Sequence, residues 1–234
     1  YTHPSAPIPA VRSGTGLEAI AQWKLAQRPP ETSSSIAEGI ARGSYRFLNR
    51  ERNLPDPVDW RLAQCGDVAH LWRFHLHYHE FLLDLAAEGL RRGESAWFDR
   101  AWRLVAAWIE GNRPGDRRVH RDGWHPFCIS RRLPAWTLLW SASPPESDIA
   151  EAILRSLCVQ ARFLEEHLEW DVRGNHLIEN AKALVFAGAF FEGAEARWWL
   201  EKAGRILRKE LGDQILPHGE HFERSPMYHA QVLE

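Results

Sequence analysis

A chain of 234 residues and 27.0 kDa is long enough for one large domain or two small ones. Hydrophobic residues make up 44% of it and charged residues 26%, the proportions of a folded globular protein with a sizeable core. A formal net charge of −2 and a pI of about 6.7 give no indication of a nucleic-acid-binding protein. No apolar run reaches the roughly 18 residues that a membrane-spanning helix needs.

The cysteines and the first residues indicate little about function. Cys65, Cys128 and Cys158 are far apart and odd in number, without a CxxC pair. They therefore predict neither a zinc finger nor a disulfide framework, and we expect small buried hydrophobes. The chain begins Tyr-Thr-His-Pro, without a starter Met or an apolar signal core. We interpret this as an interior start, so that a signal peptide would lie outside the sequence.

Residues 1–57 are predicted to form an N-terminal lead-in with short helices. Residues 14–27 favour a helix, which the adjacent Pro29 and Pro30 end. The Thr-Ser-Ser-Ser segment at 32–35 is typical of a loop or helix cap before the next apolar residue. Pro55 and Pro57 separate this region from the rest of the chain.

From residue 58 to 234 the hydrophobic pattern predicts a helical domain. Apolar residues spaced by three and four between Leu71 and Leu85 predict one helix that is buried on more than one side. Ser225-Pro226 is a good helix start. Strand-like alternation is scarce, so the predicted fold class is all-α. The same pattern fits an α/α toroid and an irregular helical bundle. Further helices are expected at 95–111, 129–140, 147–170, 176–191 and 195–211.

Two polar segments interrupt this apolar pattern in its first half. His75 and His79 are four residues apart and could share a ligand or a metal, although no HExxH motif is present. The second segment begins Trp124-His125 and ends Arg131-Arg132. Arginines beside aromatic rings suit a carboxylated or sulfated sugar. Structural histidines and an ordinary ion pair at a helix start are the alternatives.

Two loop-to-helix junctions form the third candidate feature, at residues 174–180 and 218–229. Asn175 and Ser225 are good N-cap residues, and a helix N-terminus attracts anions through its free N–H groups and its dipole. Both junctions could therefore meet a substrate carboxylate, or serve only as caps. The 12 Trp against 4 Tyr suit sugar-stacking surfaces and large helical cores alike.

Taken in order, four segments resemble the heparinase II/III family of polysaccharide lyases and its alginate-lyase relatives. The Asn-His and Ser-x-x-Tyr-His junctions are the most specific parts of this resemblance, which covers about Ile36 to the end. It implies an incomplete α/α toroid, cut before completion, with a β-sandwich domain expected beyond Glu234. The segments are LWRFHLHYHEFLLDLA, WHPFCISRRLPAW, GNHLIENAKALVFAGAFF and WLEKAGRILRKELGDQILPHGEHFERSPMYHAQVL.

The resemblance also implies β-elimination on a uronic-acid-containing polysaccharide. Asn175 matches the family's carboxylate-neutralising Asn, and His176 matches the neighbouring His. Hydrogen-bond donors on the carboxylate stabilise the enolate-like intermediate. Tyr228 matches the Tyr that takes the C5 proton and protonates the leaving oxygen. In the family, a His from the β-sandwich domain usually completes the catalytic site, and that domain is expected beyond Glu234.

An anionic polysaccharide is therefore the expected partner, with no nucleic acid, no cofactor and no metal. The lead-in and HPFCISRR are more similar to relatives thought to act on bacterial surface or capsular polysaccharides, so heparan-like, alginate-like and surface polysaccharides are all candidates. A periplasmic or secreted location is expected. The expected substrate-binding residues are Trp124, His125, Arg132, Glu223, His229 and His79.

Two other functions compete with the lyase. An α/α-toroid glycoside hydrolase needs two carboxyl groups roughly 6.5–9.5 Å apart across a cleft, for which Glu179, Glu220 and Glu223 are candidates. An acidic pair would not account for Asn175 and Tyr228 together. The second alternative is a non-catalytic, Trp-lined glycan-binding or polysaccharide-biosynthesis-associated domain.

Overall fold

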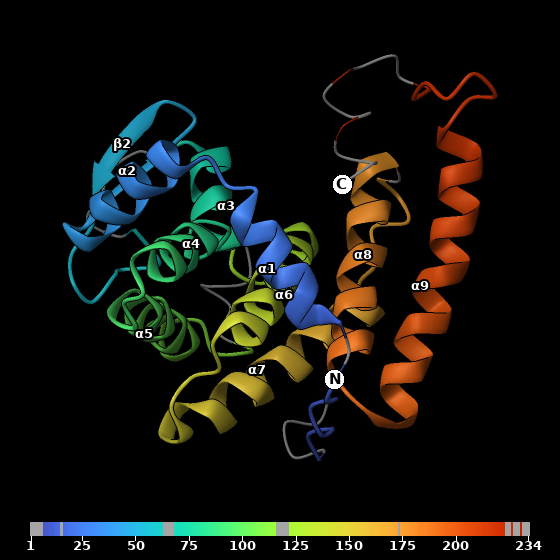
Figure 1. The fold of residues 1–234 in the computed structure, drawn as a ribbon. Coiled ribbons are helices and arrows are strands. Elements are labelled where there is room, and N and C mark those ends of the chain that lie inside the picture. The colour runs from blue at the N-terminus through green and yellow to red at the C-terminus, as the bar shows by residue number, and fades with distance from the viewer. Residues whose placement is uncertain are drawn as a thin grey trace.

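The computed structural model describes residues 7–14, 16–62, 68–115, 122–172 and 174–222, together with Pro226 and Ala230. The described residues are mostly helical, as the sequence predicts, and Figure 1 shows the helices packed around one another. None of these helices is long and apolar enough to cross a membrane. The helices are α1 (Leu17–Ala26), α2 (Pro30–Ala41), α3 (His70–Tyr78), α4 (Leu82–Arg92), α5 (Ala96–Gly111), α6 (Pro126–Ala142), α7 (Ser147–Glu166), α8 (Gly174–Phe190) and α9 (Gly193–Gln214).

Helix α2 differs from the prediction, because the segment at 32–35 is helical rather than a loop. Pro30 occupies the first turn, where a missing N–H is tolerated. The serines face α4: Ser33 Oγ donates to Asp84 Oδ1 over 2.7 Å, and Ser34 donates to Glu88. These bonds give the hydroxyl groups partners outside the helix, so they do not compete for its backbone.

A β-hairpin in the lead-in was not predicted. Strand β1 (Ser44–Phe47) pairs antiparallel with β2 (Arg50–Asn53), and the two-residue turn between them has positive φ at both positions. Positive φ at both turn residues is the geometry that matches the twist of a tight hairpin. Trp72 Nε1 donates to the carbonyl of Arg50 over 3.0 Å, which fixes the hairpin to α3.

The single helix predicted across Leu71–Leu85 is in fact two. Helix α3 ends at Tyr78, and His79 has a left-handed conformation with φ 59°. His79 is completely buried, and its Nδ1 accepts a hydrogen bond of 2.9 Å from Trp136 Nε1. Because the helix stops before His79, the helical i,i+4 relation to His75 does not apply.

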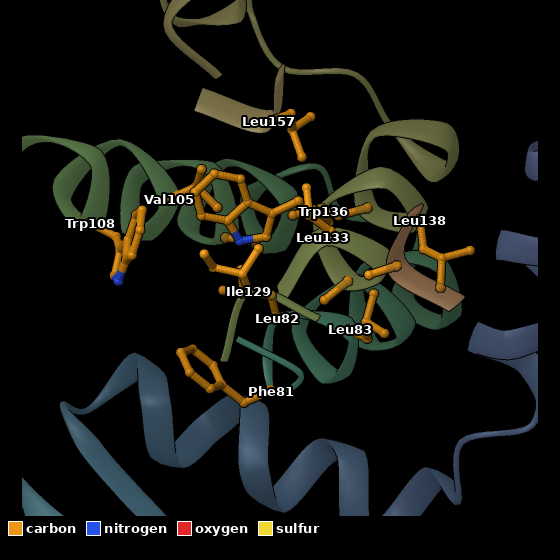
Figure 2. Close-up of a cluster of buried hydrophobic side chains, with 14 of the residues drawn as sticks. Phe81, Leu82, Leu83, Val105, Trp108, Ile129, Leu133, Trp136, Leu138 and Leu157 are labelled. Carbon is orange, nitrogen blue, oxygen red and sulfur yellow. The ribbon is translucent and has the colours of Figure 1, made fainter. Parts of the chain in front are cut away.

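Helix α6 lies at the centre of the core, packed against α1, α3, α4, α7 and α8. Figure 2 shows Trp136 and Ile129 of α6 close to Trp108, Leu82 and Leu157 from three other helices. This cluster continues into α1, α2 and β1, so one core extends across the predicted boundary between 57 and 58. Whether the lead-in is a separate domain stays a prediction.

Helices α8 and α9 lie side by side (Figure 1). Gly188 permits their close approach: a Cβ at this position would lie 2.6 Å from Cγ of Leu200 and 2.7 Å from the carbonyl oxygen of Ala196. Closure of the helices into a toroid, and a β-sandwich after them, stay predictions about the complete protein.

Candidate functional site

The starts of α6 and α8 meet, and His125 lies close enough to His176 for a charge on His176 to lower the pKa of His125. Phe127, in the first turn of α6, lies 4.3 Å from the His176 ring by centroid distance. His125, just before α6, lies 4.8 Å from the Phe74 ring. Both helix N-termini carry backbone N–H groups without helical partners, which favour a bound anion. The arrangement offers imidazoles, aromatic rings and two positive helix ends in one place.

A buried hydrogen-bond network holds His176. Its Nδ1 lies 3.0 Å from Glu169 Oε1, and the other oxygen of Glu169 accepts from Asn180 Nδ2 over 2.9 Å. Asn180 Oδ1 accepts from the Glu169 backbone N–H over 2.8 Å, so two hydrogen bonds join Asn180 and Glu169. Asn180 Nδ2 also donates to Ser130 Oγ. Because Nδ1 is engaged, Nε2 is the nitrogen of His176 left for a substrate.

His125 has a capping role as well as a place in the site. Its Nδ1 accepts from the backbone N–H of Phe127 over 3.2 Å, which satisfies one free donor at the start of α6. Partial burial lowers the pKa of His125, although the carboxylate of Glu169 opposes this shift. The ring is therefore neutral at neutral pH, with Nδ1 as an acceptor.

Asn175 is partly buried and lies in the first turn of α8 beside His176. The Asn-His pair therefore lies at a helix N-terminus, but Asn175 is inside the first turn and is not the N-cap residue that the sequence suggested. The remaining part of the predicted site cannot be placed, because Tyr228, Glu223 and His229 lie outside the described residues.

Arg132 does not have the substrate-binding position that the sequence suggested. Its exposed fraction is 0%, and its guanidinium donates to Gln160 Oε1 and to the carbonyls of His77 and Gly123 over 2.7 to 2.8 Å. It also stacks 3.9 Å above the Trp108 ring. Burial lowers the pKa of Arg132 to about 9. All these contacts are internal, so Arg132 acts as a core residue.

Trp124 and His79 are also buried rather than open to substrate. Trp124 Nε1 donates to the carbonyl of Asn112 over 2.9 Å, and its ring packs on Trp108 and Phe163. Most of the tryptophans belong to the core in the same way. Buried tryptophans are Trp60, Trp72, Trp102, Trp108, Trp124, Trp136 and Trp199, whereas Trp23, Trp170 and Trp198 are exposed.

A cleft of about 520 Å³ opens beside the His176 network, between α1, α6 and α8. Arg131 crosses it, with Nε donating to Glu80 over 2.7 Å and Nη1 lying 2.9 Å from Glu179 Oε1. Burial alone would lower the pKa of Arg131, but the two glutamates raise it. The cleft therefore contains a permanent cation. Among the residues described, no group of His, Cys, Asp and Glu is arranged to hold a metal ion.

The family model described as "Heparinase II/III N-terminus" matches residues 33–234. The chain belongs to the heparinase II/III family. A heparin-sulfate lyase from Bacteroides stercoris is 25% identical over 201 residues, which are 77% of this chain and 30% of that protein. One from Pedobacter heparinus is 28% identical over 185 residues, which are 76% of this chain and 27% of that protein.

Solved structures show the same fold for this part of the heparinase II/III family. The crystal structure of the heparan sulfate lyase HepC from Pedobacter heparinus superposes with a TM-score of 0.73 at 20% identity, over 93% of this chain and 37% of that one. A crystal structure of heparinase III gives a TM-score of 0.70 at 20% identity, with the same coverage. The chain thus spans well under half the length of these relatives.

Sequence reasoning missed the residues that support the Asn-His pair. Glu169 follows α7 and stands outside every segment that resembles the family, so no local pattern indicated it. Asn180 lies within GNHLIENAK, four residues after His176, and that spacing on a helix was the available signal. The contacts of Glu169 become visible only when α7 and α8 are packed together.

Proposed function

We propose that this chain is the helical part of a lyase that cleaves a uronic-acid-containing anionic polysaccharide by β-elimination. One observation carries the proposal: a member of the heparinase II/III family presents Asn175 and His176 at the start of α8, with His176 held by Glu169. The relatives named as heparin-sulfate lyases support a sulfated glycosaminoglycan as the first substrate to test.

The proposed roles follow from the chemistry of the uronate. Its C5 proton is weakly acidic while the neighbouring carboxylate carries a full negative charge. Asn175 and the N-terminus of α8 would donate hydrogen bonds to that carboxylate and so stabilise the enolate-like intermediate. His176, whose Nδ1–H points to Glu169, would donate from Nε2 to the same carboxylate in its protonated form. These groups bind the negative charge that builds up in the transition state. Hydrogen bonds that strengthen there lower the activation barrier of the reaction.

Tyr228 is proposed as the proton carrier. It would remove the C5 proton; the electrons then form the C4–C5 double bond, and the bond from C4 to the leaving oxygen breaks. The proton ends on that oxygen. One new chain end is therefore an unsaturated uronate, and the other is an ordinary hydroxyl.

The products separate the proposal from a hydrolase. The protein expressed from its complete gene is incubated with heparan sulfate, alginate and bacterial capsular polysaccharides, and its products are examined by ultraviolet absorbance and mass spectrometry. A lyase gives ends that absorb in the ultraviolet and lack one water relative to hydrolysis products. Cleavage that yields only saturated ends would contradict the proposal and favour a glycoside hydrolase.

A further inference from the structure

The cleft between α1, α6 and α8 has one wall from the lead-in. Trp23 of α1 lies at its rim with 58% of its surface exposed, whereas the tryptophans of the core are buried. Figure 1 shows α1 crossing in front of α6 and beside α8. Apolar atoms of Leu138 and Phe186 line the cleft as well. An exposed indole at the rim of a cleft with charged side chains is suited to stack on the flat face of a sugar ring.

Cations outnumber acids along the cleft. Its lining includes Lys24, Arg28, Arg131 and Lys182 against the carboxylates of Glu80 and Glu179. Arg28 pairs with Asp84 of α4, and Arg131 pairs with both glutamates. In the part of the chain that the structure describes, Lys24 has no acidic partner and lies 5.6 Å from the Trp23 ring centroid. An ammonium group beside an exposed indole suits a ligand whose ring has an apolar face and carries an anionic group.

Glu179 supplies an acceptor that is not used inside the protein. Its side chain is 3% exposed, and its Oε1 is held by Arg131 and by Lys182, each over 2.9 Å. Its Oε2 is buried without a hydrogen-bond partner. A buried carboxylate oxygen without a donor is costly, so a bound hydroxyl group would satisfy it.

A second acceptor lies on α6. Pro134 has no N–H, so the carbonyl of Ser130, four residues earlier, lacks its helical donor. Both residues line the cleft. Sugar hydroxyls are donors that pair with acceptors of this kind.

The cleft adjoins the hydrogen-bond network that holds His176. Ser130 lines the cleft and also accepts from Asn180, which binds the Glu169 that holds His176. Along α8 the cleft extends from Glu179 to Phe186, a rise of about 10 Å at 1.5 Å per residue. An extended polysaccharide bound at the start of α8 and running along this helix would reach the cleft.

We infer that this cleft is a binding subsite for an anionic sugar unit of the polysaccharide, next to the reacting unit. Trp23 stacks on the ring, Lys24 and Lys182 bind its carboxylate or sulfate, and Glu179 Oε2 accepts a hydroxyl. This inference rests on the proposed function for the identity of the ligand. It gives the lead-in helix a role in substrate recognition.

Binding is tested on the complete protein carrying Asn175→Ala, which blocks turnover under the proposed function. Isothermal titration with a heparan sulfate hexasaccharide is compared with and without the further double substitution Trp23→Ala and Lys24→Ala. The double substitution is expected to weaken affinity by about tenfold or more, since it removes a stacking contact and a charge. A neutral cellohexaose should bind much more weakly than the hexasaccharide, and a chemically desulfated hexasaccharide shows whether carboxylate or sulfate is bound.

Trp198 and Arg205 provide the matched control. Trp198 is 45% exposed and has a cation 5.1 Å from its ring centroid, but it lies on α9 away from the cleft. Replacing both by Ala should leave the affinity unchanged. If the double substitution unfolds the protein, Lys24→Gln alone serves as the variant. Equal affinities for the cleft and control variants, or equal affinity for the neutral hexasaccharide, would overturn the inference.

Activity assays keep this inference separate from the proposed function. With Asn175 intact, the cleft variant should raise KM with little change in kcat, because it loses binding made equally in ground and transition states. Cleft-dependent binding without unsaturated products would support the subsite and contradict the lyase. Unsaturated products with an unchanged KM would support the lyase and contradict the subsite.

Discussion

Glu169 positions His176 through the hydrogen bond between its Oε1 and Nδ1 of the ring. Under the proposed function, Glu169→Gln should lower kcat by about tenfold or more with a smaller change in KM, because the ring loses its fixed orientation. Glu201→Gln, an exposed change on α9, is the control. Steady-state kinetics on the complete protein measure both. An unchanged kcat would mean that Glu169 has only a structural role.

Arg132 belongs to the core, and its replacement should affect folding first. Arg132→Met leaves Gln160 Oε1 and two backbone carbonyls without their donor. The free energy of unfolding should fall by about 3 kcal/mol or more, measured by denaturant unfolding. Arg103→Met, at an exposed position of α5, should change it by roughly 0.5 kcal/mol at most. Full stability together with a raised KM would instead support the predicted substrate contact.

Two glycine-to-alanine substitutions test the packing of α8 on α9, because they should change the stability of the protein in opposite directions. Gly188→Ala places a methyl group against the backbone of Ala196 and the side chain of Leu200, so it should destabilise the protein by about 1–3 kcal/mol. Gly212→Ala has open space around it on α9 and should stabilise by up to about 1 kcal/mol through helix propensity. Thermal unfolding of the two variants gives the comparison. Equal destabilisation by both would contradict the close approach of these helices.

Most helices were predictable from the sequence because apolar residues recur at helical spacing and prolines or glycines separate the runs. The break at His79 was not, since the spacing from Leu71 to Leu85 continues through it. The helical conformation of the Ser-rich start of α2 was not predictable either. Its serines bind Asp84 and Glu88, which lie far along the chain. Local pattern shows periodicity but not the partners that tertiary packing supplies.

The candidate site was predictable where its residues form a motif, as Asn175 and His176 do. It was misjudged at Arg132, Trp124 and His79, because an arginine or histidine beside aromatic residues looks the same in sequence whether the cluster is buried or open. Only packing shows that Arg132 lies inside, against the Trp108 ring.

The buried histidines should make the stability of the whole molecule depend on pH. Burial and the charge of Arg132 lower the pKa of His77 to about 3 and also lower that of His79. In the unfolded chain both rings take up a proton near pH 6.5. The unfolded state therefore binds more protons between about pH 6.5 and 3, so stability is complete above this window and is lost as the pH falls through it.

Urea unfolding at pH 7, 6 and 5 measures this effect, because ordinary carboxylates remain mostly ionised there. Each imidazole should contribute a decrease of about 1.4 kcal/mol per pH unit well below pH 6.5. His77→Asn, which keeps an acceptor for Trp108 but does not titrate, should reduce the slope by up to about 1.4 kcal/mol per pH unit. A free energy of unfolding that is constant from pH 7 to 5 would contradict the buried, neutral state of these rings.

Under the proposed function, Asn175 acts on the uronate carboxylate in a β-elimination. The most direct measurement is the rise of ultraviolet absorbance when the complete protein and its Asn175→Ala variant are given heparan sulfate or the substrate found by screening. We predict unsaturated products from the unaltered protein and a rate at least about 100-fold lower from the variant, with its fold intact by circular dichroism. The same rate from both proteins would contradict this role of Asn175.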